Sequence, residues 1–258
     1  MNLTADTAAF DDIRPWRDLY RQEMNCQIIH DSLHRREGWT QSFQLRIGGT
    51  AVGYGAVAVA GPWKDKPTMF EFFVAPPYRA QAFKLFHAFQ SACGATRMEV
   101  QSNDPLITVM LHVFARGIET ESILFHDELT TSLAPAGASI RPAAPDDGEH
   151  LRSLALDESA KWIATVDGEL AGAGDILYHY NRPYGDIYMK VAESFRRQGI
   201  GAFLVQELKR VCYEGGSIPG ARCNPKNVAS RMTLQKAGFV PHAHLLTGVI
   251  PPDAKANS

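Results

Sequence analysis

The sequence predicts an α/β fold in two similar halves, and three observations support this prediction. Strand-like runs with alternating apolar residues and helices with one apolar face follow one another along the chain. A segment rich in Ala, Pro and Gly, residues 133–148, divides the chain near its middle, as a boundary between compact units does. The order of predicted elements after this segment repeats the order before it. At 258 residues the length suits one large domain or two small ones.

The first half begins with a helical stretch. Its predicted elements are, in order, one or two helices over residues 8–33, strands at 42–46, 51–59 and 69–74, a helix over about 79–93 and a strand at 97–101. In the helix over 79–93, Ala82, Phe86, Phe89 and Cys93 recur at helical spacing and form one apolar face. We expect this face to be buried.

The second half follows the same order. Its predicted elements are a strand at Ile140, a short helix near residues 146–156, strands at 162–166, 170–178 and 186–191, a helix over 201–214 and a short strand near 220–223. The helix over 201–214 is expected to bury Leu204, Leu208, Val211 and Cys212.

The two halves also share sequence at one joint between a strand and a helix. Residues 74–86 align with residues 191–203 at an offset of 117 positions. The matched pairs are Val74 with Val191, Ala75 with Ala192, Arg79 with Arg196, Gln81 with Gln198 and Phe86 with Phe203, with aromatic Tyr78 on Phe195. Two copies of one fold explain this match, and chance similarity of two amphipathic joints is the alternative. We therefore expect two domains, residues 1–134 and 139–258.

Composition excludes several classes of protein. Lys and Arg number 26 and Asp and Glu number 28, so the basic excess typical of nucleic-acid binding is missing. The longest apolar stretch, residues 51–60, is far shorter than the roughly 20 residues that span a membrane, and the N-terminus shows no signal-peptide pattern. The four cysteines are far apart and form no CxxC pair: Cys26, Cys93, Cys212 and Cys223. This spacing predicts no metal site, and we expect reduced, mostly buried thiols in a cytoplasmic protein.

The clearest sign of chemistry lies after the predicted strand at 186–191. Residues 196–201 read Arg-Arg-Gln-Gly-Ile-Gly, and glycine lets backbone N–H groups approach a ligand closely. The helix that begins there directs unpaired N–H groups and its positive dipole end at the loop, as a phosphate or pyrophosphate site requires. A tight turn without a ligand is the alternative. In the first half Ala82 and Lys84 replace Gly199 and Gly201, so we expect that half not to bind the same ligand.

Two further motifs follow this loop. Asn224-x-x-Asn227-x-x-Ser230 is followed by Lys-Ala-Gly-Phe at residues 236–239. Together with Arg-x-x-Gly-x-Gly at the end of a strand, these motifs resemble the GNAT superfamily of acetyl-CoA-dependent N-acetyltransferases. The resemblance covers residues 140–250 and is strongest over 191–239, whereas the first half resembles a degenerate copy. It implies two tandem GNAT-like domains, each with a mixed, mostly antiparallel sheet flanked by helices.

The resemblance implies that acetyl-CoA is the co-substrate and indicates which residues bind it. The loop and the first turn of the next helix would hold the pyrophosphate, and the strand ending at Val191 would splay from its neighbour and bind the pantetheine arm. Asn227 matches an asparagine that meets the pantetheine, but it equally suits a helix N-cap, with Gly238 following the end of the same helix. The expected cofactor-binding residues are Met189, Lys190, Val191, Arg196, Arg197, Gln198, Gly199, Ile200, Gly201, Ala202, Asn224 and Asn227.

The reaction implied by the resemblance is direct attack of a neutral amine on the thioester, which needs a proton acceptor, a stabilised oxyanion and a proton donor. Leu234 stands where the family has a tyrosine donor, so Ser230, one helical turn earlier, or a water molecule is the candidate donor. A helix-surface hydroxyl is the alternative for Ser230. Asp186 is the candidate base, and a turn residue is its alternative. His179 belongs to a residue type with a suitable titration range, although a lone loop histidine is usually structural.

The sequence therefore predicts an enzyme that moves an acetyl group from acetyl-CoA to a primary amine of a small molecule or amino acid. In this reading the first copy is structural or shapes the acceptor site. A non-catalytic acyl-CoA-binding or sensing protein is the alternative, because the usual tyrosine is missing. The expected partners are a CoA thioester and a small amine, without nucleic acid or membrane, and a homodimer is among the expected assemblies.

Overall fold

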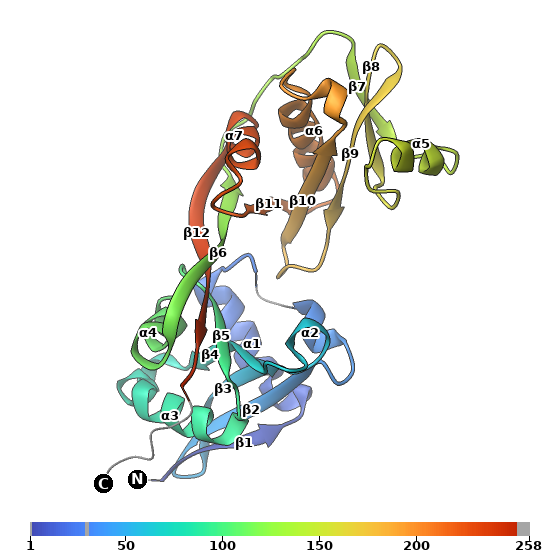
Figure 1. Ribbon diagram of the computed structural model, residues 1–258. Coiled ribbons are helices and arrows are strands. Elements are labelled where there is room, and N and C mark those ends of the chain that lie inside the picture. The colour runs from blue at the N-terminus through green and yellow to red at the C-terminus, as the bar shows by residue number, and fades with distance from the viewer. Residues whose placement is uncertain (1, 29–30, 252–258) are drawn as a thin grey trace. The chain divides into compact units, whose positions relative to one another are not determined.

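The computed structural model describes residues 2–28 and 31–251 and divides the chain into two compact units (Figure 1). Unit 1 consists of residues 1–122 and 243–258, and unit 2 consists of residues 123–242. These bounds differ from the predicted domains 1–134 and 139–258, because the end of the chain joins unit 1. The division into two copies at residues 134 and 139 stays a prediction.

Unit 1 is a mixed sheet flanked by helices. Its elements within residues 2–28 and 31–114 are β1 (Leu3–Ala8), α1 (Phe10–Met24), α2 (Asp31–Arg35), β2 (Thr40–Ile47), β3 (Thr50–Ala58), the 3-10 helix η1 (Gly61–Trp63), β4 (Thr68–Val74), the 3-10 helix η2 (Pro76–Gln81), α3 (Ala82–Cys93), β5 (Arg97–Gln101) and α4 (Pro105–Phe114). The strand order is β1-β2-β3-β4-β5-β12, where β12 (Phe239–Val249) is the last strand of the chain. All neighbours are antiparallel except β4 and β5.

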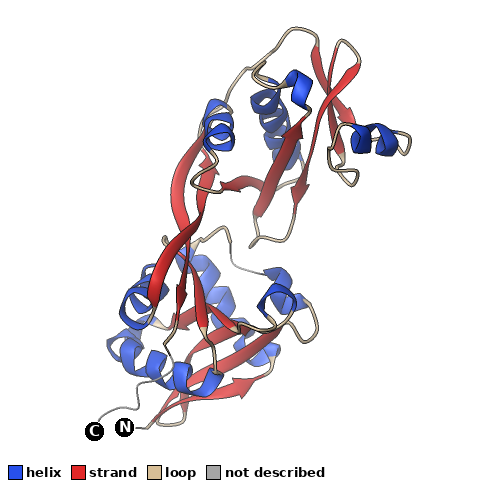
Figure 2. Cartoon of the chain, in the orientation of Figure 1, coloured by secondary structure: helices blue, strands red, loops and turns tan. Residues whose placement is uncertain are grey.

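Unit 2 has the same plan (Figure 2). Its elements are the end of β6 (Arg116–Asp127), β7 (Ala138–Pro142), α5 (Asp147–Ser153), β8 (Trp162–Val166), β9 (Glu169–Leu177), β10 (Tyr184–Val191), the 3-10 helix η3 (Glu193–Phe195), α6 (Ile200–Glu214), β11 (Ile218–Cys223) and α7 (Val228–Lys236). The strand order is β7-β8-β9-β10-β11-β6, and only β10 and β11 are parallel. The predicted α/β fold with mixed, mostly antiparallel sheets is therefore confirmed.

The sixth strand of each sheet comes from the other half of the chain. β6 ends in unit 2, where residues 123–126 pair with β11, and β12 ends in unit 1, where residues 245–249 pair with β5. Buried Lys209 on α6 fixes the end of β6, since its Nζ lies 2.5 Å from Asp127 Oδ1 and donates to the carbonyl of Leu129 at 2.8 Å. The two units are thus joined by an exchange of strands.

The repeated sequence has repeated geometry. Arg79 Nε donates to the carbonyl of Val74 at 2.9 Å, and Arg196 Nε donates to the carbonyl of Val191 at 3.4 Å, at the same offset of 117 positions. Ala75 and Ala192 follow these strands with nearly equal backbone angles, φ −57° and ψ 140° against φ −59° and ψ 145°. Chance similarity of two joints does not explain a shared hydrogen bond and a shared backbone.

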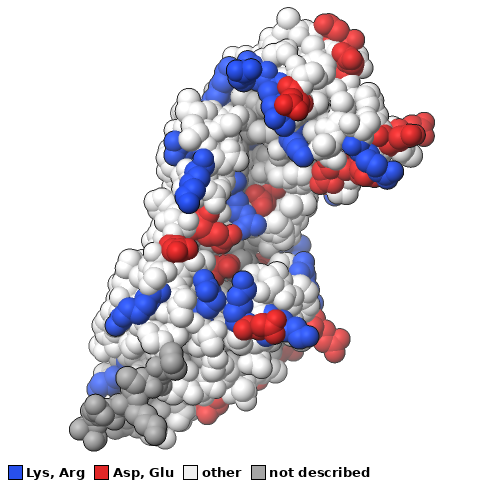
Figure 3. Space-filling view, in the orientation of Figure 1, with Lys and Arg blue, Asp and Glu red and all other residues white. Residues whose placement is uncertain are grey.

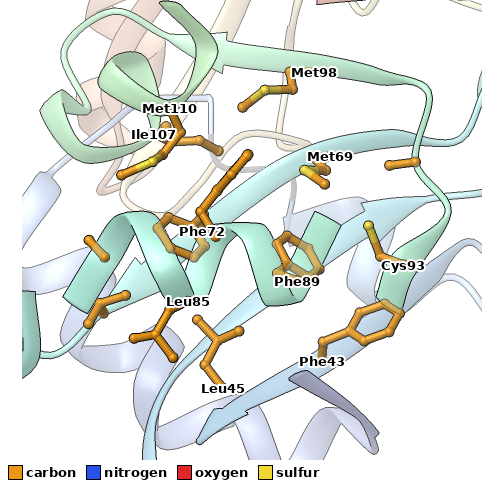
Figure 4. Close-up of a cluster of buried hydrophobic side chains, with 14 of the residues drawn as sticks. Phe43, Leu45, Met69, Phe72, Leu85, Phe89, Cys93, Met98, Ile107 and Met110 are labelled. Atoms are coloured by element: carbon orange, nitrogen blue, oxygen red, sulfur yellow. The ribbon is translucent and has the colours of Figure 1, made fainter. Parts of the chain in front are cut away.

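The core of unit 1 is aromatic and lies between the sheet and α3 and α4 (Figure 4). The predicted apolar face of α3 is buried: Ala82, Phe86, Phe89 and Cys93. In unit 2, α6 packs on one face of β9 and β10 through Leu204, Leu208 and Cys212, whereas Val211 is half-buried. All four cysteines are buried and free.

Several elements differ from the sequence prediction. A strand, β1, precedes the first helix, and the predicted helical stretch over 8–33 forms α1 and α2, with residues 29–30 outside the described part. Residues 102–132, left without a predicted element, contain α4 and β6; Asp104 caps α4 by accepting hydrogen bonds from the N–H groups of Leu106 and Ile107. In the described residues no helix is long and apolar enough to cross a membrane.

A histidine on the exchanged strand β6 predicts how unit 2 responds to acid. His126 stacks on His242 with ring centroids 3.7 Å apart and on Tyr184 at 5.4 Å. Burial, followed by the nearby His242 ring, lowers the pKa of His126 to about 4. A base with a lowered folded-state pKa contributes stability that is present above its unfolded pKa, about 6.5, and is lost as the pH falls toward 4.

We therefore expect the thermal midpoint of the protein to fall by a few degrees more between pH 7.5 and pH 5 than the midpoint of His126→Phe, which keeps the ring stack. Because the ring is only half-buried and solvent screens its charge, the difference is about 1 kcal/mol. His87→Phe, an exposed change on α3, is the control. The same pH dependence in both variants would show that His126 is not held neutral.

Candidate functional site

The candidate site begins where two parallel strands separate. β10 and β11 pair only at residues 184–186 with residues 218–220. Beyond Asp186, β10 continues to Val191 with pairing to β9 alone among the described residues. The N–H and C=O groups on the other edge of this segment are therefore left for a ligand, since buried backbone groups require partners. This is the splay that the resemblance implies for Met189, Lys190 and Val191.

The loop after β10 turns sharply into α6. Arg197 and Gly199 both have left-handed backbone conformations, with φ of 63° and 86°. Gly199 is the N-cap of α6 and has no side chain that could accept a hydrogen bond. It therefore offers no side-chain acceptor to the first-turn N–H groups of Ile200, Gly201 and Ala202. Figure 3 shows a group of Lys and Arg atoms on unit 2 over the loop between β10 and α6. Backbone donors, the helix dipole and positive charge thus meet at one place, which suits a pyrophosphate.

Gly201 stands where three segments converge. A Cβ built on it would lie 3.3 Å from Met189 Cε, 3.3 Å from Thr233 Cγ2 and 3.4 Å from Val191 Cγ2. These contacts are tight without being forbidden, so the end of β10, the start of α6 and the middle of α7 leave room here for a hydrogen atom and little more. The absence of a side chain therefore lets the first turn of α6 pack closely against the end of β10 and against α7.

Charged and polar side chains around the loop have different roles. Arg196 holds the loop against the carbonyl of Val191, and Gln198 Nε2 donates to the carbonyl of Ser194 at 3.0 Å, while Arg197 is exposed. Lys236 was not predicted from the sequence. Its Nζ lies 3.7 Å from the position of a Cβ on Gly199, so α7 brings a second source of positive charge to the loop. Lys236 belongs to the Lys-Ala-Gly-Phe motif, which was the available signal.

The residues of the two motifs that follow the glycine loop have local structural roles. Asn227 is the N-cap of α7, because its Oδ1 accepts the N–H of Ser230 at 3.0 Å, and Gly238 follows the C-cap with φ 92°. Asn224 Oδ1 accepts the N–H of Lys226 at 2.9 Å in the turn before the helix. The N-cap reading of Asn227 is thereby confirmed. Its remaining amide N–H₂ group leaves the pantetheine role a prediction.

The two candidates for acid and base chemistry lie in different surroundings. Ser230 is half-buried on α7 and hydrogen-bonds the sulfur of Cys223 at the end of β11, while Leu234 is buried in the core. Asp186 is buried at the point where β10 and β11 separate, and its Oδ2 lies 3.0 Å from His179 Nε2. The structure thus brings together the two residues that the sequence offered separately as bases.

More polar groups share a sheet face with Asp186. Successive strand residues point to opposite faces. Met189 and Val191 pack in the cluster under α6, so Asp186 and Tyr188 lie on the face away from α6. Tyr188 donates to Asp157 Oδ2 at 2.7 Å, and burial, together with this hydrogen bond, raises the pKa of Tyr188 well above its usual value. Asp175, beside Tyr188 on β9, is buried with its Oδ2 3.6 Å from Lys161 Nζ.

The corresponding place in unit 1 is closed. β4 and β5 also separate after two residue pairs, but α4 packs against both strands. Phe72, at the offset position of half-buried Met189, is fully buried and meets Phe86 edge to face at 5.1 Å, and Phe114 lies on Phe86 at 4.7 Å. No residue of the loop 75–82 has positive φ. Aromatic rings therefore occupy in unit 1 the space that is open in unit 2.

The two glycines of the loop predict different costs of substitution. Gly199→Ala forces a Cβ into a left-handed conformation with no atom nearer than 3.7 Å, so we expect a loss of about 1 kcal/mol in unfolding free energy from backbone strain alone. Gly201→Ala has an ordinary helical backbone, and its gain in helix propensity offsets its tight contacts, so its stability should stay close to that of the unchanged protein. Urea unfolding of both variants tests this, and equal stabilities would contradict the left-handed turn.

Comparisons with known proteins agree with this geometry. The family model described as the acetyltransferase (GNAT) family matches residues 127–239. No curated protein sequence matches the chain. An acetyltransferase of the GNAT family from Colwellia psychrerythraea has a similar structure, with a TM-score of 0.72 and 14% identity, over 97% of this chain and 100% of that one.

Two further solved structures are similar along nearly the whole chain. A tandem GNAT protein from the clavulanic acid biosynthesis pathway aligns with a TM-score of 0.63 and 16% identity, over 98% of this chain and 100% of that one. A GCN5-related N-acetyltransferase from Sphaerobacter thermophilus aligns with a TM-score of 0.58 and 15% identity, over 97% and 96%. At such identities the likeness concerns the fold. Residues 127–239 therefore match the acetyltransferase (GNAT) family, within a chain whose fold is similar to that of a tandem GNAT protein.

Proposed function

We propose that the protein transfers an acetyl group from acetyl-CoA to the primary amine of a small molecule or an amino acid. The family assignment supports an acyltransferase that uses an acyl-CoA. The observation that carries the proposal is the opening between β10 and β11, which leads to the uncapped first turn of α6 at Gly199 and Gly201. We place this activity in the cytoplasm, in keeping with four free cysteines, and retain a homodimer as a proposal.

Acetyl-CoA fits the residues present, because β10 keeps one edge free beyond Asp186 and the first turn of α6 begins beside it without a side-chain cap. The backbone of residues 198–202 would hold the pyrophosphate, with Arg196, Arg197 and Lys236 adding positive charge. The free edge of Met189, Lys190 and Val191 would bind the pantetheine amides, with Asn224 and Asn227 beyond it. When bound, the thioester supplies the acyl group.

We assign proton removal from the amine to the pair of His179 and Asp186. An ionised carboxylate can only accept hydrogen bonds, so Asp186 Oδ2 selects the tautomer in which Nε2 of His179 carries the proton. The other ring nitrogen, Nδ1, is then left with a lone pair that can accept a proton. A carboxylate in this position also stabilises the imidazolium that forms. Buried Asp186 thus orients the base, and His179, whose side chain is 33% exposed, is the group that can reach an acceptor.

We assign stabilisation of the oxyanion and protonation of the thiolate to groups other than His179 and Asp186. Backbone N–H groups on the free edge of β10 are preorganised donors, because strand pairing with β9 fixes their positions. Ser230 remains the candidate donor to the leaving sulfur. Buried Leu234 cannot serve, since it has no proton to give.

The second candidate function is an acyl-CoA-binding module without catalysis, and Leu234 is the observation that favours it. Such a module would show a higher thermal midpoint with acetyl-CoA, because a ligand that binds only the folded state stabilises it by mass action. It would release no free thiol with any amine tested. Thiol release above the uncatalysed rate would exclude this alternative.

Gly201→Lys tests the cradle. A lysine, the residue that unit 1 has at the offset position, places a long side chain beside the first turn of α6 and displaces the side chains packed against Gly201. We therefore expect the acetyl-CoA thermal shift to disappear, while the ligand-free protein stays folded with a somewhat lower midpoint. Glu214→Lys, at the other end of α6, makes a larger change in charge and should keep the shift. An undiminished shift in Gly201→Lys would refute the assignment.

Removal of the proposed base tests the chemistry. In His179→Ala we expect kcat/KM for the acceptor amine to fall about 100-fold or more near neutral pH, with the midpoint shift by acetyl-CoA unchanged. The loss should shrink as the pH rises, because the amine then loses its proton without help. Asp186→Asn should show the same pattern more weakly, and His150→Ala, an exposed change on α5, should have no effect. A loss of kcat/KM that does not depend on pH would indicate that His179 and Asp186 have a structural role only.

A further inference from the structure

Arg222, on β11, borders the opening between β10 and β11 and was not among the residues predicted from the sequence. The last pair of these parallel strands joins Asp186 to Gly220, and Arg222 lies further along β11, beyond that pair. The other edge of β11 pairs with β6, where Arg222 is opposite Leu124. Arg222 is therefore held in place from the β6 side and lies across the opening from the free edge of β10.

The side chain of Arg222 is on the same face of the sheet as the side chain of Asp186. Its neighbours on β11, Ala221 and Cys223, pack in the cluster under α6, and successive strand residues point to opposite faces. Arg222 consequently points away from α6, as Asp186 does. Two distances agree with this placement, since its Nε lies 4.0 Å from Asp186 Oδ2 and its Cζ lies 6.0 Å from the centre of the Tyr180 ring.

One oxygen of Asp186 lies near both the proposed base and Arg222. His179 Nε2 is 3.0 Å from Oδ2, within hydrogen-bonding distance, whereas the 4.0 Å from Arg222 Nε is too long for a hydrogen bond. The carboxylate is buried, while the side chains of Arg222 and His179 are 36% and 33% exposed. An acceptor that approaches this face therefore meets an imidazole and a guanidinium close together.

The charges of these three groups favour an acceptor that carries a carboxylate. With a neutral imidazole, Asp186 and Arg222 balance and the three groups have no net charge. When His179 takes a proton from an ammonium group, they gain one positive charge. A free amino acid becomes an anion in the same step, and a guanidinium can bind its carboxylate through two parallel hydrogen bonds. A simple amine would become neutral, and a diamine would keep a positive charge beside the arginine.

We propose that Arg222 binds the carboxylate of the acceptor and that this acceptor is a free amino acid. The inference rests on the proposed acetyl transfer at the same opening. In an amino acid only a short carbon chain separates the amino group from the carboxylate, which suits two side chains that meet at one oxygen of Asp186. Arg222 thus determines specificity, because it places the amino group beside His179.

The reaction then yields an N-acetyl amino acid. The ammonium gives one proton to Nδ1 of His179, and the neutral nitrogen forms a bond to the acyl carbon. The bond from that carbon to sulfur breaks, its electron pair goes to the sulfur, and the thiolate takes up one proton. The carboxylate on Arg222 keeps its charge throughout.

The test measures kcat and KM for thiol release from acetyl-CoA with the common free amino acids, each compared with its carboxamide and with the amine left after decarboxylation. We expect at least one free amino acid to exceed both analogues in kcat/KM about tenfold or more. Arg222→Gln should lower that value by about tenfold or more, mainly through a higher KM, and should leave both analogues unchanged. Because each acceptor is compared between two proteins, differences in amine basicity cancel.

Two more variants show whether the effect belongs to the carboxylate. Arg222→Lys keeps the charge without the planar fork and should restore part of the lost kcat/KM. Arg210→Gln, the same change on exposed α6 at the opposite face, should match the unchanged protein on every acceptor. All three variants should keep the acetyl-CoA midpoint shift. An equal loss on every acceptor in Arg222→Gln would assign Arg222 to the support of Asp186 and would overturn the proposal, as would turnover of amines without a carboxylate alone.

A binding measurement separates failure of this inference from failure of the proposed function. If no acceptor releases thiol, the protein is titrated, with free CoA present, with N-acetyl amino acids and their carboxamides, which bind without chemistry. Binding of an acid that Arg222→Gln loses and Arg210→Gln keeps would support the carboxylate site in a protein that catalyses no transfer. Equal binding of acids and carboxamides, or no binding by any acid, would overturn the proposal.

Discussion

The limited pairing of two parallel strands is the constraint on which the functional arrangement of unit 2 depends. β10 and β11 share only three residue pairs, so the second part of β10 keeps one edge free while β9 holds its other edge in place. The same divergence leaves space for α6 to begin beside that edge. Gly199 and Gly201 complete the arrangement, because the left-handed turn at Gly199 starts α6 beside this edge and Gly201 lets its first turn pack closely on β10. The pyrophosphate site that we propose therefore rests first on backbone geometry, and the basic side chains around the loop add positive charge to it.

In unit 1 the corresponding parallel strands also separate early, but side chains fill the opening between them. Its strands β4 and β5 diverge as well, yet α4 packs on both, and Phe72, Phe86 and Phe114 turn the opening into core. Burial of Phe72 and Phe86, with partly buried Phe114 packed against them, contributes several kcal/mol of stability in the place where unit 2 leaves a slot. Each sheet takes its sixth strand from the other half of the chain, so residues 245–249 of the last strand belong to the sheet of unit 1.

The sequence was sufficient for features that depend on local chemistry. Strand alternation and helical spacing predicted β8, β5 and the buried face of α3, and the repeat at Val74 and Val191 reappears as a repeated hydrogen bond. It was insufficient wherever the partner is distant along the chain. Nothing local indicates that β6 pairs with β11, or that β12 returns to β5, because strand exchange depends on which edge is free after folding. α4 was missed although Asp104 and Pro105 form a regular helix start, since its nearly continuous apolar sequence shows little periodicity.

The same distinction explains the residues that we propose for catalysis. Asp186 and His179 are seven positions apart, on a strand and in the loop before it, and each alone has a common structural explanation. Only pairing of β9 with β10 brings the loop back so that the imidazole meets the carboxylate. A buried carboxylate in this position would be costly without that partner, whereas with it the carboxylate fixes a tautomer and creates a proton acceptor. The role that we propose for Asp186 therefore follows from its contact with His179. The sequence suggested Asp186 as a base, and the structure favours it as the residue that orients one.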